Sequence, residues 1–337
     1  MHKSPVMTMP YILIGASAGG VYAMLALAAA LPADFPAPIF FVQHIGAHRS
    51  QLAELLTGRG PNRAVEGEDG QQPEPGTIYI APPDRHMLIE GGRIRLTRGP
   101  KEHHARPAID PLFRSAALDM GPRIVGVILT GMLDDGSAGL RAVKECGGIT
   151  VVQDPDDAFE PSMPRAAIAA TAVDHVVPMS ALAALLLELA RPVVVAQDPA
   201  AKPVPAAMRM EHQISFGDQT MEELKTIATP STFSCPDCGG VLFELDGMAQ
   251  VRFRCHTGHA FSLRTLMATL EPMTDVVLWA AVRTLREKEG LLRRMAVTGG
   301  GQSPAECLQE AGDLALSIAA LRRHLLSTND GRVPGDA

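Results

Sequence analysis

Aromatic residues are scarce in this sequence, where they make up 4% of 337 residues and include a single tryptophan. The apolar content of 46% is nevertheless ordinary for a soluble globular protein. Aliphatic side chains must therefore fill most of the core, which is typical of helices packed on a sheet. The length leaves room for two domains of about 100–200 residues each.

The sequence also lacks a long apolar segment, a signal peptide and an excess of positive charge, and each absence argues against a class of protein. No segment reaches about 18 uncharged apolar residues, the length that a membrane-spanning helix needs. The first residues lack the apolar region and cleavage site of a signal peptide, so we interpret "YILIG" as a first strand. A net charge of −7 argues against general affinity for nucleic acid. We expect a cytoplasmic protein without direct membrane insertion.

Apolar runs of strand length alternate with helical patterns between residues 10 and 191. The runs are "YILIG", "PIFFVQH", "TIYIAP", "IVGVILTG", "GITVVQ" and "DHVVP". The helical patterns cover 19–31, 49–58, 110–120, 137–147, 164–170 and 179–191. Near-continuous apolar strands separated by helices predict a doubly wound α/β fold, with a mostly parallel sheet covered on both faces. Sites in such folds lie at the carboxyl ends of the strands, near a topological switch point.

The composition changes after this region, and we predict four segments. "HMLIEGGRIRLTRG" inside the first segment is typical of a β-hairpin. A Pro/Ala-rich stretch then predicts a semi-extended linker, and two amphipathic patterns near 272–297 and 304–327 predict a helical hairpin. The predicted segments are an α/β domain at 1–192, a linker at 193–228, a compact zinc-ribbon-like module at 229–262 and the helical hairpin at 263–330.

The turn "GASAGG" after the first strand has two competing interpretations as a site. A dinucleotide or phosphate loop is disfavoured, because Ser17 replaces the second glycine of G-x-G-x-x-G and no Lys-Ser/Thr pair follows. The pattern does match G-x-S-x-G, in which small neighbours lift a nucleophilic serine from the strand end. A purely structural helix-capping role for Ser17 stays open at this point.

A nucleophilic serine needs a base and a group that orients the base. His44 ends the second strand, and Asp134 and Asp135 follow the strand "IVGVILTG", so all could meet Ser17 at one sheet edge. Each could instead be structural, and either aspartate could cap the helix at 137–147. An ordinary α/β-hydrolase is excluded, because its triad follows the order Ser, Asp, His.

The blocks "IGASAGG", "FVQHI", "YIAPPDRHM", "HHARPAIDPLFRSAA", "VILTGMLDDGSAGL" and "MPRAAI" resemble the chemotaxis protein-glutamate methylesterase family (CheB-type catalytic domain) over about residues 10–191. The resemblance implies a serine hydrolase that demethylates receptor glutamates, deamidates certain glutamines and needs no cofactor for catalysis. It also implies Ser17 as nucleophile, His44 as base and Asp135, not Asp134, as acid. Backbone amides near Ala18 and at Met132 would bind the oxyanion.

The sequence departs from the family at two positions and in its architecture. Ala18 replaces a threonine, and Leu133 replaces a glycine of the acid turn. The phospho-receiver domain that precedes the catalytic domain in the chemotaxis enzymes does not fit before the first strand, so we expect regulation through the C-terminal part or separate partners. Arg106 and Arg165 could line the mouth and attract acidic receptor helices. The implied partners are a methylated chemoreceptor and a methyltransferase or histidine kinase system.

Three of the five cysteines form a cluster with metal-ligand spacing. Cys235 and Cys238 form C-x-x-C, and Cys255 follows after sixteen residues with two histidines nearby. Thiolate and imidazole on two tight turns favour a tetrahedral structural zinc site. His259 is preferred to His256 as the fourth ligand because its spacing reaches around the turn more easily. A disulfide is disfavoured, since it leaves one thiol unpaired in a reducing compartment.

Two other functions remain open on sequence grounds. The fold could survive as a catalytically weak or inactive scaffold whose C-terminal part recruits a partner. The triad alone is also compatible with a general carboxylesterase or amidase of small substrates.

Overall fold

The computed structural model describes residues 6–46, 50–195, 206–217, 221–246, 250–299 and 303–329. The chain divides into two compact units, Met1–Leu266 and Met267–Ala337. Each is described separately below.

A parallel sheet of seven strands forms the centre of the first unit, in the order β10-β9-β8-β2-β3-β5-β4. Its strands are β2 (Tyr11–Ala16), β3 (Ile39–Gln43), β4 (Arg63–Glu66), β5 (Thr77–Ile80), β8 (Ile124–Ile128), β9 (Ile149–Gln153) and β10 (His175–Val177). All six predicted strands are present. β4 was not predicted, because this edge strand, "RAVE", ends in charged residues and has no apolar run.

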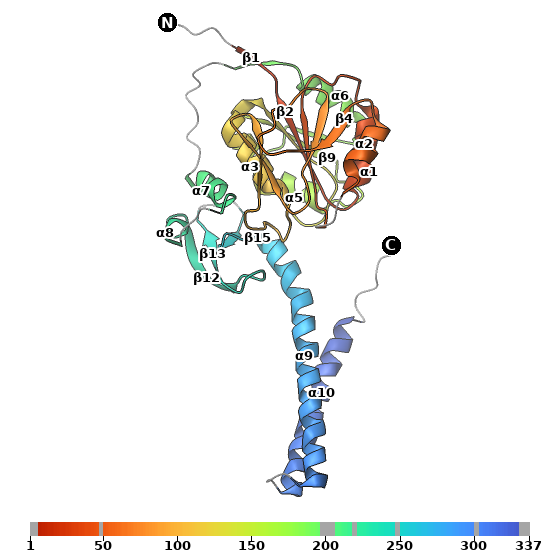
Figure 1. Cartoon of the computed structure of the whole chain (residues 1–337), viewed down its shortest axis with the longest axis vertical. Coiled ribbons are helices and arrows are strands. Elements are labelled where there is room, and N and C mark those ends of the chain that lie inside the picture. Colours follow the sequence, from red (N-terminus) through yellow and green to blue (C-terminus); the bar gives the residue numbers. More distant parts are fainter. Residues whose placement is uncertain are drawn as a thin grey trace. The chain divides into compact units, whose positions relative to one another are not determined.

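Helices cover both faces of this sheet, as predicted (Figure 1). On one face lie α1 (Gly20–Ala30), α2 (Leu52–Arg59) and α6 (Met179–Leu189). On the other lie α3 (Ile109–Met120), α4 (Ser137–Glu145) and α5 (Ser162–Ala170). Successive residues of β2 serve opposite layers, since Leu13 packs under α3 while Ile12 and Ile14 pack under α1. This double burial explains the near-continuous apolar runs in the sequence.

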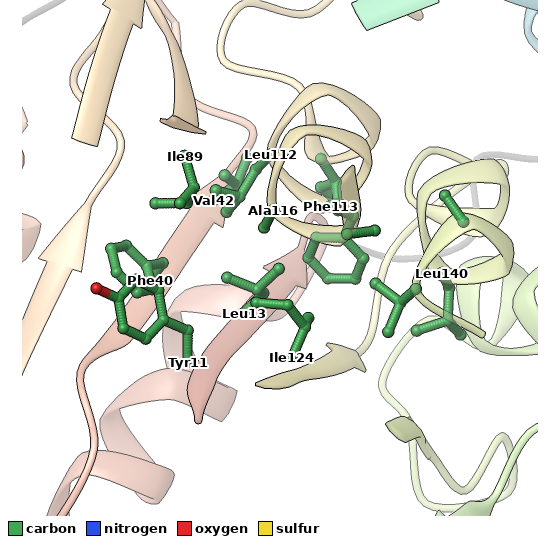
Figure 2. Close-up of a cluster of buried hydrophobic side chains, with 14 of the residues drawn as sticks. Tyr11, Leu13, Phe40, Val42, Ile89, Leu112, Phe113, Ala116, Ile124 and Leu140 are labelled. Carbon is green, nitrogen blue, oxygen red and sulfur yellow. The ribbon is translucent and has the colours of Figure 1, made fainter. Parts of the chain in front are cut away.

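Figure 2 shows the layer under α3, where Leu112 and Phe113 lie over side chains of the central strands. Phe113 is fully buried and shares its cluster with Leu13 of β2 and Ile124 of β8. α3 is therefore fixed to the two strands that flank the switch point between β2 and β8, where the chain reverses its direction of winding.

Shorter elements complete this part of the chain. β6 (His86–Glu90) and β7 (Arg93–Thr97) form the predicted hairpin, and a 3₁₀ turn, η1, covers Gly121–Arg123. β1 (Val6–Thr8) pairs antiparallel with β11 (Val193–Val195).

The predicted linker contains more structure than its composition indicates. Besides β11, its described residues form α7 (Ala206–Ile214) and the short α8 (Met221–Leu224), whereas 196–205 and 218–220 lie outside the described residues. The prediction of a semi-extended segment is wrong for α7. Met208 packs into the same core as α3, so tertiary burial stabilises a helix with little sequence signal of its own.

A second, antiparallel sheet follows, in the order β12-β13-β14-β15. The strands are β12 (Ala228–Ser234), β13 (Val241–Leu245), β14 (Arg252–Cys255) and β15 (Ala260–Ser262). Leu242, Phe253 and Phe261 form a small core with two of the cysteines.

The second unit is formed by α9 (Leu263–Thr298), whose first turn belongs to the first unit, and by α10 (Pro304–Asn329). Val282 packs with Ile318 and Leu325, and Leu292 packs with residues near the start of α10. The hairpin thus has the predicted pairing. By length and composition alone α9 is apolar enough to cross a membrane, with a mean hydropathy of 1.2 over 18 residues. A single helix of this kind is weak evidence for a span, because some helices of soluble proteins have the same composition.

We expect Phe113→Ala to lower the free energy of unfolding by about 3–5 kcal/mol, because it leaves a cavity under α3. Urea denaturation followed by circular dichroism measures the change. Phe159→Ala is the matched control, since this side chain is exposed. Equal losses in the two variants would contradict the assigned core.

Candidate active site

Ser17 lies in the tight turn between β2 and α1. Its N–H donates to the carbonyl of Thr130 (3.0 Å), and its own carbonyl accepts from Gly20 (2.8 Å). Gly19 has a φ of +77°, and a Cβ on Gly20 would lie 2.2 Å from the Gln43 side chain. Two glycines are therefore required for the chain to turn here and leave the serine at the carboxyl end of the strand.

His44 follows β3, the neighbour of β2, and its ring lies between the other two predicted triad residues. Nδ1 is 3.1 Å from Ser17 Oγ, and Nε2 is 2.7 Å from Asp135 Oδ2. The side-chain amide of Gln43 donates to the backbone carbonyls of Ser17 (2.8 Å) and His44 (3.3 Å), and so connects the turn after β2 with the segment after β3. With the proton on Nε2, the ring donates to the carboxylate and accepts the serine hydroxyl on Nδ1.

Asp135 is 2% exposed and lies at the amino end of α3. Besides His44, its carboxylate accepts the N–H groups of Ile109 (2.7 Å) and Asp110 (3.1 Å). Burial alone would raise the pKa of Asp135, but the charge of His103 and the hydrogen bonds from His44 and Ile109 lower this pKa to about 2. The carboxylate is therefore ionised and directed at the imidazole.

Asp134, the neighbouring candidate, points to a different part of the structure. Its Oδ1 accepts from Ser262 Oγ (2.7 Å) and Thr265 Oγ1 (3.1 Å), which lie at the end of β15 and the start of α9. The structure thus separates the two adjacent aspartates and brings only Asp135 to His44.

His103 is a buried residue of the site that the sequence did not single out. Its Nε2 is 3.1 Å from Asp110 and 3.8 Å from Asp135, and its Nδ1 is 3.0 Å from Thr265 Oγ1. Burial would lower the pKa of His103, but the hydrogen bond to Asp110 and the nearby carboxylates, Asp134 included, raise it to about 9. The ring is therefore an imidazolium among carboxylates. In "GPKEHHARP" it is indistinguishable from solvated basic residues.

Two residues with large exposed apolar side chains lie close to the serine turn. Met132 is 58% exposed and follows Gly131, whose Cβ, if present, would lie 2.9 Å from Ser17 Cβ. Phe159 is 82% exposed, and its side chain lies over Gly19. The residue after Phe159 is held by Thr130, whose Oγ1 accepts from the Glu160 N–H (2.8 Å). Phe159 is an addition to the predicted site, because an isolated phenylalanine has no distinguishing sequence signal.

The two positions that depart from the family pattern, Leu133 and Ala18, lie in the acid turn and in the serine turn. Leu133 has a φ of +62°, the left-handed conformation that a glycine would favour. The Ala18 carbonyl accepts from Thr130 Oγ1 (2.8 Å).

The two predicted arginines differ in their surroundings. The Arg106 guanidinium donates to Asp84 (2.9 and 2.6 Å) and to the carbonyls of Arg98 and Gly99, so it is engaged by its own loop. Arg165 is exposed and lies 3.9 Å from Asp156. In the described residues, no hydrogen bond or ion pair joins either arginine to the triad.

The cysteine cluster converges in the second sheet, where the candidate ligand atoms of Cys235, Cys238, Cys255 and His259 lie within 4.8 Å of one another. The Cys238 and Cys255 sulfurs are 3.7 Å apart, and Cys255 Sγ is 3.5 Å from His259 Nδ1. Tetrahedral zinc with Zn–S bonds of about 2.3 Å requires a sulfur separation of about 3.8 Å. The donor set therefore fits zinc. The His256 ring packs instead on Gly240.

Comparison with known proteins identifies relatives of the first part of the chain. The family model described as CheB methylesterase matches residues 12–186. A Leptospira interrogans protein named for protein-glutamate methylesterase and protein-glutamine glutaminase activity is 41% identical over 180 residues, which are 53% of this chain and 93% of that protein. The protein-glutamate methylesterase FrzG of Myxococcus xanthus is 40% identical over 181 residues, 53% of this chain and 54% of FrzG.

A solved structure gives the same result for the fold. The CheB methylesterase catalytic domain of Thermotoga maritima is 33% identical and superposes with a TM-score of 0.52. The match covers 54% of this chain and 99% of that domain. Residues after 186 lie outside the family match.

The charge on His103 predicts that the folded protein loses stability as the pH rises. Because folding raises the pKa of this residue from 6.5 to about 9, its contribution is complete below about 6.5 and is lost as the pH rises through about 9. We expect the free energy of unfolding to fall across this range, and His103→Gln to flatten the dependence. Urea denaturation at several pH values measures both, with Ser17→Ala as control. Parallel curves for wild type and His103→Gln would refute the assignment.

Proposed function

Because this chain belongs to the CheB methylesterase family, we propose that it is a protein-glutamate methylesterase acting on chemoreceptor-like proteins. We propose glutamine deamidation as its second activity, in line with the names of its relatives. The observation that carries the proposal is the hydrogen-bonded series Ser17–His44–Asp135 at the carboxyl edge of the sheet.

In the proposed mechanism, His44 Nδ1 takes the proton of Ser17 as its Oγ attacks the ester carbonyl. Backbone amides near Ala18 and at Met132 hold the oxyanion. As the tetrahedral intermediate breaks down, His44 gives this proton to the ester oxygen, which leaves as methanol, or to the amide nitrogen of a glutamine substrate, which leaves as ammonia. Water, activated by His44, then releases glutamate from the acyl-enzyme. Asp135 accepts a hydrogen bond from Nε2–H throughout and stabilises the imidazolium.

The surroundings of Ser17 support a protein substrate. Phe159 and Met132 offer exposed apolar surface close to the nucleophile, which suits the side chains that flank the esterified glutamate on a receptor helix. Arg165 provides exposed positive charge for an acidic helix, and Arg106 acts indirectly by fixing the loop from Asp84 to Gly99. We also propose that the protein works with a methyltransferase or histidine kinase system and that it is cytoplasmic.

For the rest of the chain, we propose a structural zinc bound by Cys235, Cys238, Cys255 and His259, and no cofactor for catalysis. The proposed domain limits are 1–192 for the catalytic domain, 193–228 for the connection, 229–262 for the zinc-ribbon-like module and 263–330 for the helical hairpin.

Ser17→Ala is expected to abolish methanol release from a methylated receptor preparation, because the nucleophile is lost. Asp135→Asn is expected to lower kcat by a factor on the order of 10⁴, since the imidazole then loses its orienting acceptor. Fluorophosphonate labelling of wild type separates a hydrolase from an inactive scaffold. Labelling without methanol release would instead favour a small-substrate esterase.

The purified chain is expected to contain one zinc per molecule, measured by atomic emission. His259→Ala should reduce the zinc content and the thermal stability, because the site loses a ligand. His256→Ala, with its ring packed on Gly240, is the matched control and should retain the metal. A metal loss in His256→Ala with retention in His259→Ala would reverse the ligand assignment.

A further inference from the structure

We propose that Ser262 and Thr265 are positioning residues for the triad, so that the segment after the second sheet completes the catalytic site. This inference rests on the proposed hydrolase function of Ser17. Both residues lie far beyond the part of the chain that the family model matches. Their hydroxyls act through Asp134 and His103.

The first contact is with the aspartate turn itself. Ser262 Oγ donates to Asp134 Oδ1 (2.7 Å), and Thr265 Oγ1 donates to the same oxygen (3.1 Å). The Thr265 N–H donates back to Ser262 Oγ (3.0 Å), which orients the serine. All three side chains are buried. Because Asp134 precedes the triad acid in the chain, a carboxylate fixed on one side constrains the backbone that directs Asp135 at His44.

The second contact runs through His103. Thr265 Oγ1 is 3.0 Å from His103 Nδ1, and the opposite ring nitrogen is 3.1 Å from Asp110 Oδ2. Asp110 belongs to the first turn of α3, whose amides bind Asp135. The His103 N–H donates to the Ala260 carbonyl on β15 (2.8 Å), so its backbone is also held by the second sheet. Thr265 therefore contacts both Asp134, which precedes the triad acid in the chain, and His103, which lies beside its carboxylate.

Buried ion pairs hold the second sheet in place against these residues. Arg254 on β14 donates to Glu102 (2.8 Å) and to Glu211 on α7 (3.0 Å), and Arg114 of α3 donates to Glu102 (2.6 Å). Arg252 on β14 donates to Glu211 (2.9 Å). All five side chains are buried, so each charge depends on its partners for solvation.

The central variant is Thr265→Val in the full chain, because valine keeps the shape of threonine and removes the hydroxyl. We expect kcat for methanol release to fall on the order of 10–100-fold, as small displacements of catalytic groups do, with KM within about twofold. Thr265→Ser restores the hydroxyl and is expected to restore most of kcat. Thr274→Val is the matched control, since that hydroxyl donates to the Leu270 carbonyl on an exposed face of the same helix.

The rate of Ser17 labelling by a fluorophosphonate provides a readout that is independent of the receptor. A slower rate in Thr265→Val and a normal rate in Thr265→Ser, at unchanged zinc content and melting temperature, support the inference. Equal labelling rates in wild type and Thr265→Val overturn it and leave the hydrolase intact. Wild type that neither labels nor releases methanol instead rejects the proposed function.

Ser262→Ala covers the case in which Thr265→Val does not fold. It removes one hydroxyl and leaves the contact between Thr265 and Asp134. A kcat loss with unchanged KM in this variant supports the inference, and a wild-type kcat overturns it.

Discussion

The carboxylate of Asp135 accepts hydrogen bonds from His44 and from the first two amides of α3, and the arrangement of the site depends on these bonds. Burial makes an unpaired carboxylate costly, so the helix, the imidazole and the acid turn are fixed relative to one another. α3 in turn rests on β2 and β8 through Phe113, and β2 delivers Ser17. A single ionised group thus connects the core packing with the placement of Ser17.

The sequence predicted those features that follow from local pattern and parallel-sheet geometry. Ser17, His44 and Asp135 each follow an apolar strand, and carboxyl ends of parallel strands share one edge, so their meeting could be anticipated. The fold class is confirmed by the sheet, its covering helices and the similarity to the Thermotoga domain. The roles of the three residues, the zinc ligands and the domain limits stay predictions.

The features that the sequence did not reveal are those created by long-range packing. The position and charge of His103 depend on a hydroxyl 162 residues away and on carboxylates from two other segments, so no local pattern marks it as buried. α7 follows a Pro/Ala-rich stretch and is stabilised by Met208 in the core and by the pairing of Glu211 with two arginines. Arg106 matched a family block, yet its guanidinium serves its own loop because Asp84 and two carbonyls already satisfy it.

Because of the arginines of β14, the part of the chain with the parallel sheet cannot be separated from the second sheet without loss of buried ion pairs. If the chain were cut after the parallel sheet, Glu102 would lose Arg254 and Arg252 and, among the described residues, would keep Arg114 as its cationic partner. A fusion that grafts this hydrolase onto another receptor system would therefore need either the whole stretch through Leu266 or a neutral side chain in place of Glu102. The region of the parallel sheet and the cysteine-bearing sheet that follows it thus share one set of buried ion pairs.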